Sequence, residues 1–421
     1  MRKCRLYKYP TRLDVKKASF HQRIICLIAV VSAIIYAIYI VPTNAYALAY
    51  ENGSLELEKE LSSEIDNQLK QIDFTALDNM IADLDANTTP IINFEGIANG
   101  VKKVVAGELS LEYDSIFSLL LTAFSGCIKK YIPLMLFVLG ATIMCSILGK
   151  IKSKNNEKSL NDITNIVCIS LVVVAIGSCV KNLLATTSQT ILSIRSQMTA
   201  VFPILLTLAV SVGSTKSVGL YKPAVALLST GVSQLFISFV LPLFILSIVF
   251  TFVGNISNSI KLDKVNGFIT SLFKWVVGVT FTIFFAVISI QGISASTFDS
   301  VSIRTAKFTI KSYVPIMGGY LTEGFDLILS SSLLIKNGVG IVGMIILLST
   351  IINPILELAI FSLLLKLTCA IMQPLCDDKL VKILDGVAKS LNILSTTIIV
   401  LSFMYLLMMG MIMATAGSVF V

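Results

Sequence analysis

The chain has 421 residues, of which 55% are hydrophobic and 14% are charged, and its mean hydropathy is +0.86. Soluble globular domains carry about 25% charged residues, so this composition excludes an ordinary soluble protein and indicates a membrane protein. The formal net charge of +8 does not indicate nucleic-acid binding, because nearly all of it lies in the first 47 residues, where eight lysines and arginines accompany one aspartate.

Residues 1–47 have the pattern of a signal peptide. The basic segment precedes an apolar run from Ile24 to Val41, and Ala45 and Ala47 then form the small pair of a cleavage site. Cleavage after Ala47 is one interpretation. Since the apolar run is longer than the usual h-region of about 7 to 15 residues, an uncleaved signal anchor is the other. In both cases the following chain begins outside the cytoplasm.

Residues 48–119 are predicted to form an acidic, helical, extracytoplasmic region. Its first part, residues 48–100, holds eleven acidic residues and two lysines. Leu57, Leu61, Ile65 and Leu69 recur every fourth residue and predict an amphipathic helix, and the pattern continues over residues 72–84 as a second helix. These helices are expected either to cap the membrane domain or to dock a partner.

Residues 120–421 are predicted to be a polytopic α-helical membrane domain with six to eight crossings. The first strong span, residues 131–149, precedes a loop with four lysines, which marks the cytoplasmic side. Residues 163–180 then return outward. This orientation agrees with an exported N-terminal region.

Some of the later apolar runs suggest broken or re-entrant helices. Residues 201–213 are short for a span, whereas residues 223–254 are too long for one straight span and contain Gly231 and Pro242 as breaks. The next loop, around Lys261, Lys264 and Lys274, looks cytoplasmic because of its lysines. This requires that the two runs together cross an odd number of times.

The last part of the chain contains four further apolar runs. Residues 273–293 are predicted to cross, and runs follow at residues 341–352, 355–372 and 391–414, the first two separated by Pro354. Short runs that contain proline or glycine are typical of broken helices lining a polar cavity.

The sequence lacks the usual parts of catalytic and metal sites. It has no G-x-x-x-x-G-K-[ST] motif, its one histidine, His21, lies in the signal region, and its eight cysteines include no C-x-x-C pair. We therefore expect no catalysis, no metal and no cofactor.

A cationic segment lies between the apolar runs. Arg304, Lys307 and Lys311 have the i, i+3, i+7 spacing of one helix face, Pro315 and the following glycines break this helix, and a second helix is predicted over residues 321–336. The segment is expected either to be an interfacial helix whose cations meet lipid headgroups, or to direct its cations toward a cavity or a partner.

Acidic residues near this segment are candidate counter-charges. In the second interpretation, Glu323 and Asp326 lie close to the cations. Glu357 and Lys366 are lone charges in a later apolar run, and their nine-residue spacing puts them about half a turn out of phase, so we expect them not to pair with each other.

Two stretches of the sequence carry a resemblance to a known family. "AVISIQGISASTFDSVSIRTAKFTIKSYVPIMG" (286–318) and "SSSLLIKNGVGIVG" (330–343) resemble the stage III sporulation protein AE family of endospore-forming bacteria. The resemblance covers roughly residues 120–421. Together with the candidate counter-charges Glu323 and Asp326, the residues that we expect to form a functional membrane motif are Gln291, Gly292, Arg304, Lys307, Lys311, Pro315, Lys336 and Asn337.

The resemblance implies a non-enzymatic subunit in the mother-cell membrane, part of a channel-like or secretion-like complex that joins the mother cell to the engulfed forespore. The implied partners are the other stage III sporulation A-operon proteins, including an ATPase and ring-forming subunits, the forespore protein Q and membrane lipid, without nucleic acid. A self-sufficient transporter of a small solute is the alternative, because broken helices suit it equally.

Overall fold

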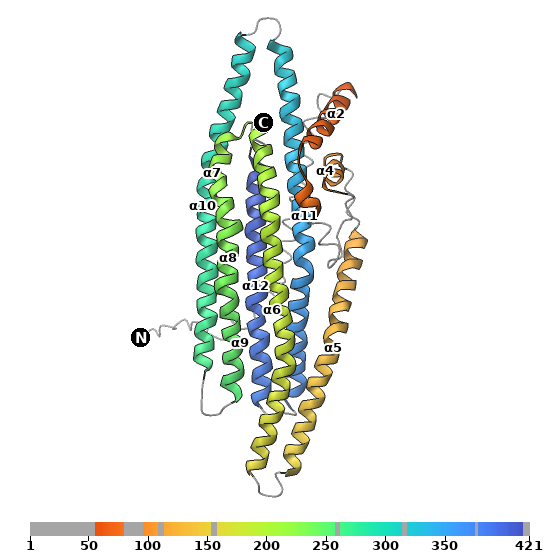
Figure 1. Ribbon diagram of the computed structural model, residues 1–421, viewed down its shortest axis with the longest axis vertical. Helices are drawn as coiled ribbons and strands as arrows, with labels where there is room; N and C mark the ends of the chain where they lie inside the picture. Colours follow the sequence, from red (N-terminus) through yellow and green to blue (C-terminus); the bar gives the residue numbers. More distant parts are fainter. Residues whose placement is uncertain are drawn as a thin grey trace, which may run out of the picture. The chain divides into compact units, whose positions relative to one another are not determined.

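The computed structural model describes residues 55–79, 96–107, 113–152, 158–256, 262–313, 318–374 and 378–415, and all regular elements in these ranges are helical. The chain divides into two units, Met1–Glu56 and Leu57–Val421. The signal-peptide prediction, with Ala45 and Ala47, lies outside the described residues. The helices are α2 (Leu55–Gln71), α4 (Ile97–Val105), α5 (Tyr113–Lys152), α6 (Lys158–Ser211), α7 (Thr215–Ala226), α8 (Ser233–Leu235), α9 (Leu241–Ile256), α10 (Asp263–Tyr313), α11 (Gly318–Met372) and α12 (Asp378–Ala414) (Figure 1).

Among the described residues, six helical segments are long and apolar enough to cross a membrane, which confirms the predicted fold class and is the lower of the expected numbers of crossings. They are Leu120–Ile147, Ile166–Ser211, Thr215–Asn255, Lys264–Gln291, Gly319–Met372 and Lys379–Ala414. The helices α6, α10 and α11 have 54, 51 and 55 residues, about 80 Å each at ~1.5 Å per residue. Since the hydrocarbon core is ~30 Å thick, each of them extends well beyond it.

Two predicted interruptions are absent, because the helices continue through their prolines. Residues 201–211 are not a separate half-helix but the end of α6, which contains Pro203. Residues 341–352 and 355–372 belong to one helix, α11, with Pro354 inside it. In lipid a helix satisfies its own backbone groups, so losing one hydrogen bond at a proline costs less than ending the helix.

The predicted breaks at Gly231 and Pro242 correspond to π-helical turns within one crossing. These turns, Leu227–Val232 and Phe236–Val240, connect α7, α8 and α9. Pro242 lacks an N–H, and its ring crowds the carbonyl four residues earlier, so a wider turn just before it accommodates the ring. Residues 201–211 belong to α6, so the runs 201–213 and 223–254 add only one further crossing after that of α6. One is an odd number, as expected.

The ends of the helices separate into two groups (Figure 1). The lower ends of α5 and α6, of α9 and α10, and of α11 and α12 lie together, and the α5–α6 pair extends furthest. At the opposite end lie α2, α4, the last residues of α10, the first of α11 and the C-terminal end of α12. From the lysines beside the α5–α6 connection we expect the lower end on the cytoplasmic side, and on this expectation the opposite end is called the extracytoplasmic end below.

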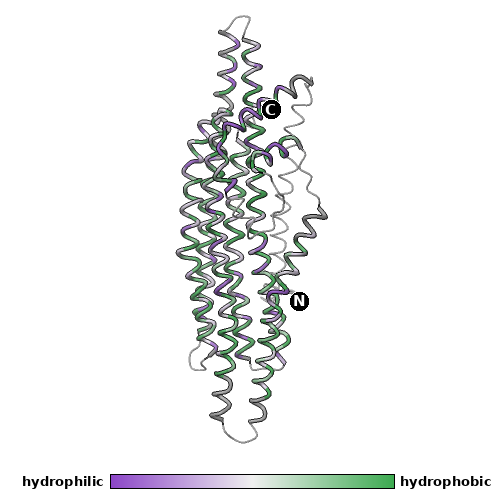
Figure 2. The backbone as a smooth tube through the Cα atoms, turned by 45° about the vertical axis from the view of Figure 1, so that its right-hand side comes forward, coloured by the Kyte–Doolittle hydropathy of each residue, from purple (hydrophilic) through white to green (hydrophobic). Residues whose placement is uncertain are grey.

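The bundle interior is formed mainly by α6, α11 and α12, which pack closely on one another, and apolar residues predominate through it (Figure 2). A polar network ties α9, α10 and α12 together nearer the cytoplasmic end. The Ser247 hydroxyl donates to Asn266 Oδ1 at 2.7 Å and lies 2.8 Å from the Ser390 hydroxyl, and Asn266 Nδ2 donates to Thr251 Oγ1 at 2.9 Å. Buried polar groups in this region are thus paired with one another.

The N-terminal helices agree only partly with the sequence pattern. The first amphipathic helix is α2, as predicted, and a further helical segment is described from Thr75 to Asn79. Asp73 Oδ1 accepts hydrogen bonds from the Thr75 backbone N–H and hydroxyl, and these bonds lower the pKa of Asp73. Helix α4 was not predicted; Asp78 Oδ1 accepts a 2.9 Å bond from the backbone N–H of its first residue, Ile97.

Candidate functional site

The predicted motif residues lie on two helices that meet at the extracytoplasmic end. Gln291, Gly292, Arg304, Lys307 and Lys311 belong to α10, while Glu323, Asp326, Lys336 and Asn337 belong to α11. Pro315 lies outside the described residues. The outer parts of the two helices, residues 304–313 and 318–329, are called the α10–α11 hairpin below (Figure 1).

One cation of the predicted face has a counter-charge on the neighbouring helix. Lys307 Nζ lies 2.5 Å from Asp326 Oδ1, with side chains 23% and 43% exposed. Arg304, Lys311 and Glu323 are exposed, and none of the three forms an ion pair within the described part of the chain. The structure therefore joins Lys307 to Asp326 and leaves Arg304 and Lys311 open to other groups.

The α10–α11 hairpin continues along the direction of α10 and is not a separate helix lying across the bundle (Figures 1 and 2). Ile303 is buried against the turn between α6 and α7, where Gly213 has φ +87° and a Cβ would lie 2.9 Å from the Ile303 side chain. Glycine is needed there because both its backbone conformation and its small size are required. Beyond Ile303, Phe308 and Tyr320 are 71% and 72% exposed.

Lys336 is the most deeply buried charged residue among those described. Its side chain is 0% exposed, and Nζ donates a hydrogen bond to the backbone carbonyl oxygen of Thr415, directly after α12. A lysine at this place satisfies a terminal carbonyl and complements the negative end of the α12 dipole. In the described residues, the Oδ1 atom of its neighbour Asn337 is buried without a hydrogen-bond partner, as is Oε1 of Gln291.

Helix α2 is held on α11 by hydrogen bonds that sequence reasoning missed. Gln68 Nε2 donates to the Ser331 hydroxyl at 2.9 Å, and the Ser332 hydroxyl donates to Gln68 Oε1 at 2.9 Å. Both serines are buried. The only signal for this contact was the serine run that precedes Lys336 in an otherwise apolar stretch.

Glycines of α11 allow other helices to approach closely at successive levels. A Cβ at Gly338 would lie 2.9 Å from Val101 Cγ1 of α4, and one at Gly343 would lie 2.7 Å from Met409 Cε of α12. A Cβ at Gly340 would overlap the side chain of Met413 in α12. Together with the serines and Lys336, these glycines make residues 331–343 the junction where α2, α4, α6 and α12 contact α11.

The lone acid of α11 pairs with a lysine on another helix. Glu357 Oε1 forms an ion pair with Lys130 of α5 and accepts a 2.6 Å hydrogen bond from the Tyr131 hydroxyl. This agrees with the expectation that Glu357 does not pair with Lys366. The Glu357 side chain is 13% exposed, and an ion pair with a further hydrogen bond is how a charge is accommodated in a membrane-spanning segment.

The residues described above belong to the α10–α11 hairpin and to the buried junction of α11. Over the residues that the structure covers, no group of three or more histidine, cysteine, aspartate or glutamate side chains could hold a metal ion. The site is a long antiparallel hairpin with exposed cations and aromatic rings, and a buried junction anchors it.

These features define a polytopic α-helical membrane protein with a projecting extracytoplasmic hairpin. The chain belongs to the stage III sporulation protein AE family, whose model matches residues 96–416. It is 30% identical over 278 residues to "Stage III sporulation protein AE" of Bacillus subtilis (strain 168), covering 66% of this chain and 69% of that protein. No solved structure matches the chain. The family match begins 24 residues before the expected start at residue 120 and so includes α4.

Proposed function

We propose that this sporulation protein is a non-enzymatic subunit of a channel or secretion-like complex between mother cell and forespore, embedded in the mother-cell membrane. The observation that carries the proposal is the α10–α11 hairpin, which extends from the bundle on the extracytoplasmic side with Phe308 and Tyr320 exposed. Large exposed apolar side chains beside unpaired cations are typical of a protein interface.

The proposed partners are the other A-operon proteins, an ATPase and ring-forming subunits among them, and the forespore protein Q. A partner segment with carboxylates and an apolar patch fits the hairpin best. Arg304 supplies a planar donor group that can bind a carboxylate through two hydrogen bonds, while Phe308 and Tyr320 supply apolar area.

A self-sufficient permease for a small solute is the second candidate function, and polar groups inside the bundle favour it. Gln197 is 1% exposed and donates a 2.5 Å hydrogen bond to Thr350, and its Oε1 atom has no partner among the described residues. The Tyr405 hydroxyl is also buried without a partner in that part of the chain. Such groups could line a path when the helices separate.

Two experiments distinguish the candidates. The tagged protein is purified in mild detergent from sporulating cells and its bound proteins are identified, and the protein alone is reconstituted in liposomes for solute uptake. A subunit co-purifies with the A-operon proteins and transports nothing alone. Solute uptake by the isolated protein, without stable partners, would instead establish the permease.

A further inference from the structure

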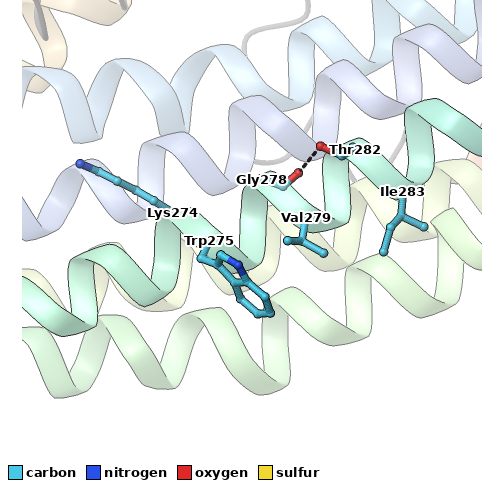
Figure 3. A pocket seen from close by; sticks show the side chains of 6 residues that line it. All are labelled: Lys274, Trp275, Gly278, Val279, Thr282 and Ile283. Carbon is cyan, nitrogen blue, oxygen red and sulfur yellow. Dashed lines mark hydrogen bonds between the residues drawn. The ribbon is translucent and has the colours of Figure 1, made fainter.

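A shallow groove runs along the outer face of α10, inside the membrane-spanning segment Lys264–Gln291. Its volume is about 320 Å³, and its lining residues are Lys274, Trp275, Gly278, Val279, Thr282 and Ile283 (Figure 3). Trp275 is 66% exposed and Ile283 is 55% exposed, so both side chains project from the bundle into lipid.

The floor of the groove is apolar and open. Gly278 lies between Trp275 and Ile283, and a Cβ placed on it would meet no atom within 4 Å. The Thr282 hydroxyl donates a 2.8 Å hydrogen bond to the carbonyl oxygen of Gly278, shown in Figure 3. The one hydroxyl in the groove is therefore satisfied within its own helix, and the remaining surface suits a hydrocarbon chain.

A cation lies at one end of this apolar surface. Lys274 is exposed and forms no ion pair within the described ranges. In Figure 3 its side chain extends away from Ile283, toward the start of α10. That start lies at the cytoplasmic end of the bundle, and Lys274 lies at the beginning of the crossing expected over residues 273–293, so the ammonium group can reach the headgroup region of the inner leaflet.

We propose that this groove binds one anionic phospholipid of the cytoplasmic leaflet. The phosphate pairs with Lys274, and an acyl chain lies over Gly278 between Trp275 and Ile283. The order of charge and apolar surface along α10 matches the order of headgroup and chain in a lipid. A tryptophan beside a lysine is also the usual composition of a membrane interface.

The chain offers a direct probe, because Trp275 is its only tryptophan. The full-length protein is reconstituted in phosphatidylcholine bilayers that contain a small, equal fraction of brominated phosphatidylglycerol or of brominated phosphatidylcholine. Bromine quenches indole fluorescence on contact. We expect phosphatidylglycerol to be preferred about fivefold, which is the contribution of one lysine near an anionic surface.

Matched variants separate the groove from general lipid contact. Lys274→Gln should abolish the preference, whereas Lys264→Gln, an exposed lysine nearer the start of the same helix, should retain it. Gly278→Leu should fill the floor and reduce quenching by both lipids. Gly267→Leu, where a Cβ also meets no atom within 4 Å, should leave quenching unchanged.

The wild-type comparison alone can overturn the proposal. Equal quenching by the two brominated lipids overturns the proposal, as does a preference that persists in Lys274→Gln. Absence of quenching by either lipid also overturns it, since a second copy of the chain would then cover the groove.

Discussion

The Nζ atom of Lys336 on α11 donates a hydrogen bond to the backbone carbonyl oxygen of Thr415, at the end of α12. The lysine side chain is fully buried, and Thr415 is 4% exposed. This bond therefore joins two long helices at the level where the extracytoplasmic helices α2 and α4 dock.

Replacing Lys336 by methionine should destabilise the bundle. The side chain keeps a similar length, but the Thr415 carbonyl loses its donor inside the protein, at a cost of about 1–3 kcal/mol in the free energy of unfolding. The measurement is unfolding of the purified protein in detergent. Lys389→Met is the control, because Lys389 is 70% exposed in an i, i+4 pair with Asp385 and should change stability by less than about 0.5 kcal/mol. Unchanged or increased stability in Lys336→Met would contradict this account.

Gly340→Leu should weaken the contact between α11 and α12. The added side chain occupies the space of Met413, and overpacking of this kind costs about 1–3 kcal/mol. Gly410→Leu on α12 is the matched control, since a Cβ there meets no atom within 4 Å. Thermal unfolding of the two variants in detergent should show a lower midpoint for Gly340→Leu alone, and equal midpoints would refute the packing assignment.

Gln68→Ala should release α2 from α11. It removes both hydrogen bonds to Ser331 and Ser332 and leaves their buried hydroxyls with fewer partners. We expect faster tryptic cleavage after Lys70, the last lysine of α2. Gln71→Ala, an exposed glutamine one turn further along, is the control, and identical cleavage rates in the two variants would count against the docking.

Charge changes at Lys307 and Asp326 should affect sporulation through the hairpin. Lys307→Glu should lower the yield of heat-resistant spores, since it reverses a charge on the hairpin. The protein should remain at normal membrane abundance, because a half-exposed ion pair contributes only about 0–1 kcal/mol to stability. Combining it with Asp326→Lys restores opposite charges and should recover part of the yield. Arg304→Lys should also impair sporulation, because lysine cannot form a planar two-bond contact with a carboxylate.

The control for these variants is Lys103→Glu, which reverses an exposed charge on α4 at the same end of the bundle. Wild-type spore yield in both Arg304→Lys and Lys307→Glu, with membrane levels checked by blotting, would favour the other interpretation, an interfacial helix whose cations only meet lipid headgroups.

The side of the membrane on which each end lies can be tested with fused reporters. An alkaline phosphatase fused after Gly100 or after Thr415 should be active outside the cytoplasm, and one fused at Asn155 should be inactive. The Thr415 result follows from six crossings, with α12 ending at the same end of the bundle as α4 (Figure 1). A cytoplasmic signal at Thr415 would require an odd number of crossings.

Local patterns in the sequence predicted the features that depend on neighbouring residues. The four-residue repeat predicted α2, and the apolar runs predicted the membrane-spanning helices. Pro315 and the following glycines predicted the break between α10 and α11. The sequence placed Asp326 beside Glu323 as a candidate counter-charge of the cationic segment, and the structure pairs Asp326 with Lys307.

Features that depend on distant partners were not predictable in this way. Whether a helix continues through Pro203 or Pro354 is decided by the helices around it, which supply the packing that offsets the missing hydrogen bond. The hydrogen bonds of Gln68 and the ion pair of Lys130 with Glu357 join residues more than 220 positions apart. The spacing of apolar and polar residues along the sequence does not predict contacts at such a separation.

The docking of α2 on α11 has a consequence for biosynthesis. Gln68 and Ser331 are separated by 263 positions, and ribosomes add about 5–20 residues per second. The external region thus emerges roughly 13 to 50 s before its binding surface has been translated. During this interval the buried faces of α2 and α4 are uncovered on the far side of the membrane, so their maturation waits for insertion of α10 and α11, and a stalled or truncated chain would display them to extracytoplasmic proteases.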